Sequence, residues 1–94
     1  MEWRASHILV RDKSLAEAII KRLKSGGSFE ALARDFSTCP SKSKGGDLGW
    51  FSEGQMVKPF EDAVKKGSKG RILGPVKTRF GYHIIRKTGE RQES

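Results

Sequence analysis

The sequence predicts a single α+β domain built around a small mixed or antiparallel β-sheet. Its 94 residues are enough for one hydrophobic core but not for two. Segments with strand-like patterns alternate with segments of helical periodicity, and the last two strands lie close enough in the chain to pair as a hairpin. The expected order is therefore strand, helix, helix, loop, strand, helix, strand, strand.

The first part of the chain predicts one strand and two helices. Residues 3–10 alternate weakly between apolar and polar and are expected to form a strand. The residues expected on one face of this strand are Trp3, Ala5, His7 and Leu9. Ser14 and Glu17 have the spacing of a capping box, which predicts the start of the first helix. Ser28 is the expected N-cap of the second helix, whose apolar residues recur at helical spacing.

The second part predicts a long loop, a third helix and a closing hairpin. Ser, Lys, Pro and Gly dominate residues 37–49, and a loop of this length in a small domain is usually functional or mobile. Residues 48–51 could form a short strand. Pro59 is tolerated only in a first helical turn, so the third helix is expected to begin near Val57 or Lys58 and to end at Gly67. The expected final segments are strands at 71–78 and 82–88 and a polar tail at 89–94.

The charge and cysteine content limit the possible functions. The sequence has 19 Lys and Arg against 11 Asp and Glu, a formal net charge of +8, which raises the question of a nucleic-acid partner. The basic residues are spread along the whole chain, however, and the aromatic residues mostly lie in apolar patterns. This distribution favours a solvated basic surface. The single cysteine, Cys39, excludes an internal disulfide and any zinc site with several cysteines.

Two histidines and the cysteine are candidates for chemistry. His7 and His83 both lie inside apolar runs, so each could be a hydrogen-bonded core residue or one member of a pair on adjacent strands. Buried neutral imidazoles should have pKa values below the unfolded reference. Cys39 could be a small buried apolar residue or, together with a histidine, a nucleophile.

Three apolar residues near the glycine-rich loop allow two interpretations. Leu48, Met56 and Phe60 could belong to an ordinary core or could line a small apolar pocket open to a ligand. Gly45–Gly49 is not a phosphate-binding loop, because the Lys-Ser/Thr pair that follows such a loop is missing. No metal-ligand spacing is present among the acidic residues.

Short segments spread along the chain carry a family resemblance. In order, these segments are His7–Val10, Phe29–Ala33, Phe36–Pro40, Gly45–Phe51, Gly54–Ala63, Gly74–Thr78 and Phe80–Ile85. In this order they resemble the parvulin family of peptidyl-prolyl cis/trans isomerases, and especially its short single-domain members. The resemblance covers about residues 4–88, which we take as the core of one domain spanning residues 1–94. It implies a four-stranded antiparallel sheet surrounded by helices, in a parvulin-like fold that resembles the FKBP architecture.

The resemblance also implies roles for particular residues. It implies that His7 and His83 lie on neighbouring central strands as a hydrogen-bonded pair, with Thr78 beside them and Cys39 facing the reacting amide. It further implies that Leu48, Met56 and Phe60 hold the proline ring, with Gln55 at the rim. Phe80 stands where some relatives carry a small polar residue, so it is expected to narrow the pocket.

The implied activity is rotation of X–Pro bonds in unfolded or folded proteins, without a cofactor or a metal. Phosphate-directed parvulins carry a longer basic loop after the first strand, whereas here Arg11–Lys13 is the whole link, which favours a general folding helper. The alternatives are a peptide-binding chaperone module on the same fold and a nucleic-acid-binding protein. No apolar run reaches the roughly 18 residues of a membrane span. We expect a cytoplasmic monomer, or a domain excised from an exported foldase.

Overall fold

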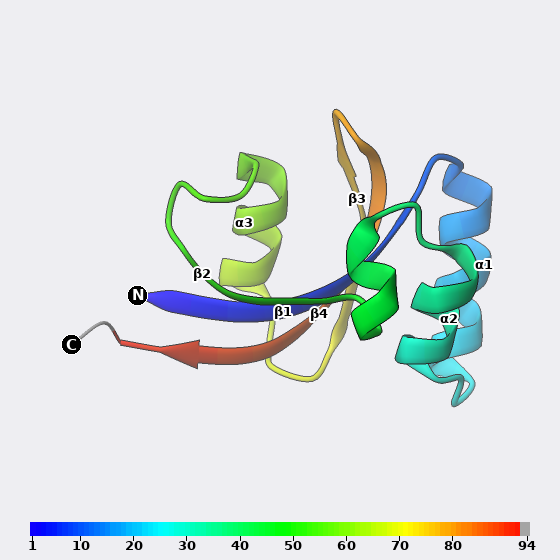
Figure 1. The fold of residues 1–94 in the computed structure, drawn as a ribbon, viewed down its shortest axis with the longest axis horizontal. Coiled ribbons are helices and arrows are strands. Elements are labelled where there is room, and N and C mark those ends of the chain that lie inside the picture. The colour runs from blue at the N-terminus through cyan, green and yellow to red at the C-terminus, as the bar shows by residue number, and fades with distance from the viewer. Residues whose placement is uncertain (93–94) are drawn as a thin grey trace.

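A four-stranded antiparallel sheet lies at the centre of the computed structural model, which describes residues 1–92 (Figure 1). Across the sheet, the strands are β2 (Asp47–Ser52), β1 (Glu2–Val10), β4 (Gly81–Arg91) and β3 (Ile72–Thr78). The first and last strands are therefore the central pair, and the start of β1 and the end of β4 lie at the same end of the molecule (Figure 1). The antiparallel alternative and the expected order of elements are confirmed.

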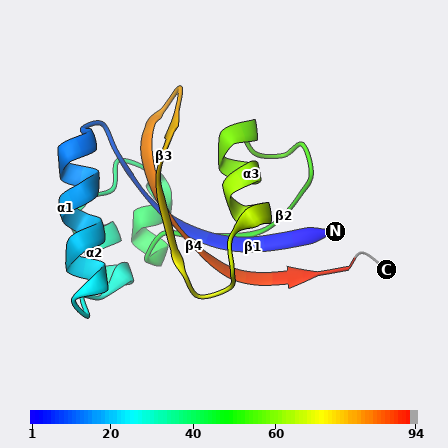
Figure 2. The ribbon, with the colours of Figure 1, turned by 180° about the vertical axis from the view of Figure 1, so that it is seen from behind.

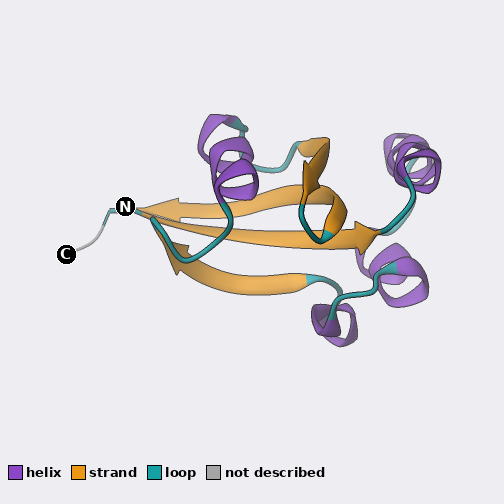
Figure 3. Cartoon of the chain, turned by 90° about the horizontal axis from the view of Figure 1, so that it is seen from above, coloured by secondary structure: helices purple, strands orange, loops and turns teal. Residues whose placement is uncertain are grey.

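Three α-helices surround the sheet (Figure 3). Helices α1 (Lys13–Lys24) and α2 (Phe29–Phe36) lie together at one end of the molecule, away from α3 (Lys58–Lys66), as the front and back views show (Figures 1 and 2). Among the described residues, no helix is both long and apolar enough to cross a membrane.

The helices divide the core into two apolar clusters on opposite faces of the sheet. Neighbouring residues in a strand point to opposite faces, and Ile84 and Ile85 in β4 accordingly belong to different clusters. The first cluster joins α1 and α2 to the sheet and contains Ile8, Val10, Ala16, Ile19, Phe29, Leu32, Ala33 and Ile84. The second lies under α3 and contains Trp3, Ala5, Phe51, Phe60, Val64 and Ile85. Alternation along β1 and β4 thus places His7 and His83 on the α3 side, where Phe60 meets both rings.

The helix starts agree with the sequence patterns except in α1. Ser28 accepts a hydrogen bond from the Ala31 N–H, as expected of the N-cap of α2, and α3 begins at Lys58. In α1 the capping box expected at Ser14 is wrong. Asp12 is the N-cap, and its carboxylate accepts from both the backbone N–H and the hydroxyl of Ser14. A carboxylate two residues earlier can take both protons, so the helix begins one residue before Ser14.

The last strand extends farther than its sequence suggests. β4 continues to Arg91, so the polar tail expected from residue 89 is wrong for its first three residues. These residues pair with the start of β1, Gly89 is buried against the ring of Trp50, and the Arg91 Nε donates to the Glu2 carboxylate at 2.8 Å. Cross-strand pairing thus orders a segment that has no apolar alternation of its own. The rest of the expected tail includes residues 93–94, which lie outside the described residues.

The end of the long loop lies beside the middle of β1. The loop contains a short 3-10 helix, η1 (Pro40–Lys44), and the Gly46 carbonyl then accepts a hydrogen bond from the His7 N–H at 2.9 Å. Gly46 has a φ of 92°, and a Cβ atom there would collide with the His7 carbonyl oxygen. Glycine is therefore required for the loop to approach the strand that carries His7.

Candidate active site

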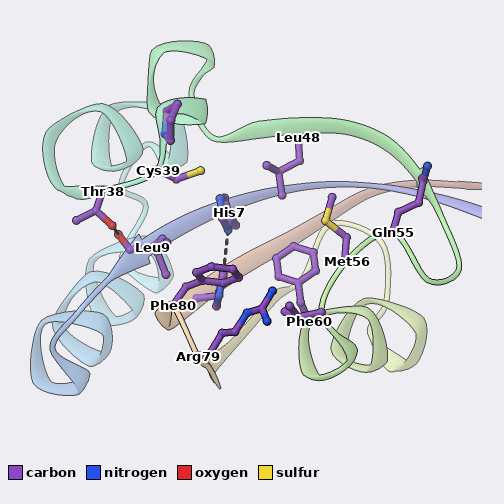
Figure 4. Close-up of a pocket in the computed structure, with 13 residues that line it drawn as sticks. His7, Leu9, Thr38, Cys39, Leu48, Gln55, Met56, Phe60, Arg79 and Phe80 are labelled. Atoms are coloured by element: carbon purple, nitrogen blue, oxygen red, sulfur yellow. Dashed lines mark hydrogen bonds between the residues drawn. The ribbon is translucent and has the colours of Figure 1, made fainter.

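A cavity of about 430 Å³ opens beside β1, between the loop that carries Cys39, the start of α3 and the β3–β4 hairpin (Figure 4). It joins residues that are far apart in the chain. Of the nine residues expected at the site, eight line it: His7, Cys39, Leu48, Gln55, Met56, Phe60, Phe80 and His83. The ninth, Thr78, is hydrogen-bonded to His83. The structure therefore brings the predicted residues together, as a pocket rather than as a closed core.

His7 and His83 form a direct hydrogen bond between the two central strands. His7 is paired in register with Ile85, and His83 with Leu9, so the two histidines are diagonal neighbours on one face of the sheet. Their Nδ1 atoms are 2.9 Å apart, and their rings are stacked with centroids 5.1 Å apart. The pair implied by the family resemblance is therefore present.

Thr78 connects this pair to the hairpin. The Thr78 Oγ1 lies 2.7 Å from the His83 Nε2 and accepts the Phe80 N–H at 3.1 Å. If the Thr78 hydroxyl donates to His83, the His83 Nδ1–H donates to the His7 Nδ1, and the proton of His7 is on Nε2. We assign this direction because it uses the Thr78 hydroxyl as both donor and acceptor. The His7 Nε2 is buried and has no hydrogen-bond partner among the described residues.

Burial keeps both rings neutral. The exposed fractions of His7 and His83 are 5% and 4%. Desolvation lowers the pKa of His7 to about 4, with a smaller contribution from the charge of His83, and desolvation lowers the pKa of His83 to about 4. In the assigned tautomers, protonating His7 would put a donor on its Nδ1, where the Nδ1–Nδ1 hydrogen bond needs an acceptor, and protonating His83 would put a donor on its Nε2, which accepts from Thr78. Near pH 7 the pair is therefore a rigid, uncharged part of the cavity wall.

Phe60 forms the apolar base of the cavity. Its ring packs edge-on against both imidazoles, with centroids 5.7 Å from His7 and 5.3 Å from His83, and it also contacts Phe51. Leu48 and Met56 are half-buried and line the same cavity. The second apolar cluster thus ends in a surface that is open to a ligand, so the two interpretations of these residues are both partly right: they are core and pocket at once.

Hydrogen bonds of the Ser37 side chain and the Thr38 backbone hold Cys39 beside the end of β1. The Ser37 hydroxyl oxygen accepts from the Leu9 N–H at 3.0 Å and from the Cys39 N–H at 3.3 Å, and the Thr38 N–H donates to the Leu9 carbonyl at 2.8 Å. Cys39 is a half-buried free thiol. Among residues 1–92, no hydrogen bond joins this thiol to either histidine, so the arrangement lacks the thiol–imidazole contact that a cysteine nucleophile needs.

The turn before Met56 supports the other side of the cavity, and side-chain hydrogen bonds to its backbone stabilise it. The Gln55 side-chain oxygen accepts the Ser52 N–H at 2.6 Å, which leaves its amide NH₂ as the group available to a ligand. The Glu61 carboxylate is 6% exposed and accepts the Gly54 N–H at 2.7 Å. Glu61 therefore fixes the turn that precedes Met56. This role of Glu61 could not be predicted from the sequence, because nothing in the seven-residue spacing from Gly54 to Glu61 indicates a contact.

Several lining residues were also not predicted from the sequence. These residues are Leu9, Thr38, Pro40, Val57 and Arg79. Four of them are chain neighbours of a predicted residue, and Leu9 lies two positions from His7 on the same face of β1. This closeness in the sequence is the feature from which they could have been predicted. Arg79 is the one that adds a new property, because it brings a fixed positive charge to the cavity.

Comparisons with known proteins agree with this geometry. The PPIC-type PPIase domain matches residues 2–91. The chain is 58% identical over 89 residues to the foldase protein PrsA of Bacillus subtilis (strain 168), covering 94% of this chain and 30% of that relative. It therefore spans about a third of the length of the curated relatives it matches.

Solved structures show the same fold. The crystal structure of PrsA from Bacillus subtilis superposes with a TM-score of 0.92 at 56% identity, over 98% of this chain and 36% of that chain. The solution structure of NmPin, the parvulin of Nitrosopumilus maritimus, superposes with a TM-score of 0.84 at 48% identity, over 94% of this chain and 96% of that one. The fold, the paired histidines and the match over residues 2–91 together show that this chain belongs to the parvulin family of PPIC-type peptidyl-prolyl isomerase domains.

Proposed function

We propose that this domain catalyses cis/trans isomerisation of X–Pro bonds in protein segments, and that it does so without forming a covalent bond to the substrate. The observation that carries the proposal is the apolar cavity whose base, Phe60, packs against two neutral, mutually hydrogen-bonded histidines in its wall. The membership of the family supports the reaction, and the foldase relatives support proteins as substrates.

The reaction needs a grip on the proline and a suitable environment for the turning amide. The uncatalysed barrier is about 18–20 kcal/mol, because amide resonance is lost when the bond is perpendicular. No bond has to break, so a nucleophile is not required. In our proposal Leu48, Met56 and Phe60 hold the proline ring while the preceding carbonyl rotates. An acceleration of about 10⁴ needs only about 5.5 kcal/mol of preferential binding to the twisted amide.

The polar residues act on the twisted amide in this proposal. A neutral histidine pair keeps the base of the cavity rigid and dry, which strengthens dipolar interactions with the substrate. Thr78 holds His83 in one tautomer. Cys39 lies at the wall near the rotating carbonyl and adjusts its surroundings, and the free amide NH₂ of Gln55 binds the substrate backbone at the rim. Phe80, which is 54% exposed, narrows the opening.

We further propose that the domain acts on unphosphorylated segments, as a general folding helper. The link between β1 and α1 is only Arg11–Lys13, and its acidic residue is already engaged as the cap of α1. Two cations around one carboxylate do not provide the several arginines that a phosphate clamp uses. Cytoplasmic localisation, a monomeric state and the absence of a nucleic-acid partner stay predictions.

The test is two-dimensional exchange NMR on an unphosphorylated Ala-Pro peptide, with and without substoichiometric protein. We expect the exchange cross-peaks between the cis and trans forms to grow with protein concentration. Shift changes that report binding, with no change in the exchange rate, would instead identify a peptide-binding module.

A further inference from the structure

Arg79 carries the single fixed charge among the described residues that line the cavity. The other titratable lining groups are the two histidines, which burial keeps neutral near pH 7, and Cys39. No aspartate or glutamate in the described part of the chain lines the cavity. Arg79 therefore brings the only fixed formal charge that the described lining residues contribute to the cavity.

The hairpin holds Arg79 in a defined position. The turn consists of Arg79 and Phe80 alone, because Thr78 and Gly81 are already paired across the strands. Thr78 accepts the Phe80 N–H, and the Arg79 guanidinium lies 4.9 Å from the centre of the Phe80 ring. A short turn and a cation–π contact limit the conformations of this side chain. Arg79 is thus the chain neighbour of Thr78, whose hydroxyl contacts the histidine pair.

Arg79 has no carboxylate partner among residues 1–92. Ion pairs in this part of the chain engage other cations, for example Arg4 with Asp47 and Arg86 with Glu30. Because the Arg79 guanidinium makes no side-chain hydrogen bond or ion pair among the described residues and lies over the Phe80 ring, its hydrogen-bond donors are available to a group that enters the cavity.

The lining residues form two groups, on opposite sides of the cavity. Leu48, Met56 and Gln55 lie toward one side, and Thr38, Cys39 and Leu9 toward the other (Figure 4). In the function proposed above, Met56 and Phe60 hold the proline ring and Cys39 lies near the rotating carbonyl, which puts the residue that carries this carbonyl on the Cys39 side of the cavity. That residue is the one before the proline, and Arg79 lies on the cavity wall between Phe80 and Phe60 in this view.

We propose that Arg79 determines the preference for the residue before proline and favours a carboxylate there, so that Glu-Pro and Asp-Pro segments are better substrates than Lys-Pro segments. This inference rests on the proposed function and adds the substrate class to it. Because Arg79 is an exposed side chain at the rim, the preference is moderate: about fivefold in kcat/KM for Glu-Pro over Lys-Pro at low salt. It decreases as salt is added, since exposed charges are screened.

The experiment compares blocked peptides with Glu, Gln or Lys before the proline, using exchange NMR on the wild type and three variants. Arg79→Gln removes the charge and Arg79→Glu reverses it. Arg34→Gln is the matched control, because it makes the same change in net charge at an exposed position on α2 that does not line the cavity. The readout is the Glu-to-Lys ratio of kcat/KM within each protein, so a general loss of activity cancels.

We expect the ratio to be preserved in Arg34→Gln, to approach one in Arg79→Gln, and to fall below one in Arg79→Glu. A wild-type ratio of one, or a ratio that both Arg79 variants leave unchanged, would overturn the inference. If the wild type accelerates none of the peptides, the proposed function fails separately. The Glu-to-Lys ratio of dissociation constants from chemical-shift titration then tests Arg79 by the same criteria.

Discussion

The Nδ1 atoms of His7 and His83 lie 2.9 Å apart, so two buried neutral rings share one hydrogen bond across the central strands. The hydrogen bond exists only while at least one of the two nitrogens is unprotonated. The protonation state of this pair therefore links the stability of the fold to the shape of the cavity, and it determines how the protein should respond to acid.

Stability should decrease as the pH falls from about 6.5 toward 4. Both folded pKa values are lowered to about 4, so the unfolded chain takes up protons before the folded one does. The contribution of each histidine is complete above the unfolded pKa of about 6.5 and is at most about 2 kcal/mol smaller at about pH 5. Urea unfolding over this range measures it. Histidine ring signals that titrate near pH 6.5 in the folded protein would contradict the neutral pair.

Replacing either histidine should reduce folding stability before it affects chemistry. In His7→Ala or His83→Ala the remaining ring keeps a buried polar atom without its partner, which costs about 1–3 kcal/mol in addition to the cavity that is left. Thermal melting beside the exchange assay checks this. Variants that melt like the wild type and yet have lost all turnover would make the histidines direct acid–base catalysts.

Met56→Ala should weaken turnover while leaving the fold intact. Met56 is half-buried and lines the cavity, so its loss removes part of the apolar grip on proline, at roughly 25 cal/mol for each Å² no longer covered. Phe60→Ala is a poorer test, because that ring supports both imidazoles. The matched control is Ile20→Ala, on the opposite apolar cluster. If Ile20→Ala and Met56→Ala lower kcat/KM equally, the cavity is not where proline binds.

Phosphorylation before the proline should change the rate only moderately. One arginine in the cavity and the short basic link favour a negative charge but do not form a phosphate clamp. We expect phosphorylated Ser-Pro peptides to exchange less than about tenfold faster than the unmodified peptides, a limit that corresponds to about 1.4 kcal/mol. A larger ratio in the exchange assay would show a phosphate-directed enzyme.

Helices and strands with a regular sequence pattern could be predicted, whereas those parts whose structure depends on contacts between distant segments could not. The apolar periodicity of α2 and the position of Pro59 fixed two helices, and the runs around His7 and His83 indicated strands. The last residues of β4 carry no such pattern, since their order comes from pairing with Glu2 and its neighbours.

The candidate site shows the same division. The family resemblance named most of the residues of the cavity, but the periodicity of the chain alone left both core and pocket open for Met56 and Phe60. Neither the resemblance nor the periodicity predicted the contacts that support the site. The Glu61 carboxylate accepts a hydrogen bond from the backbone N–H of Gly54, and the Ser37 hydroxyl accepts one from the N–H of Leu9 on a distant segment. Such contacts depend on which distant segments the fold brings together, and residue type and spacing do not indicate this.

The central claim is that rotation of the X–Pro bond here needs no covalent intermediate. The most direct measurement is the cis/trans exchange rate of an Ala-Pro peptide with the Cys39→Ala variant, after melting has shown that the variant is folded. We expect a rate that is lower than with the wild type but still clearly above that of the peptide alone. A folded Cys39→Ala protein that leaves the peptide at its uncatalysed rate would contradict the account and support attack by the thiol.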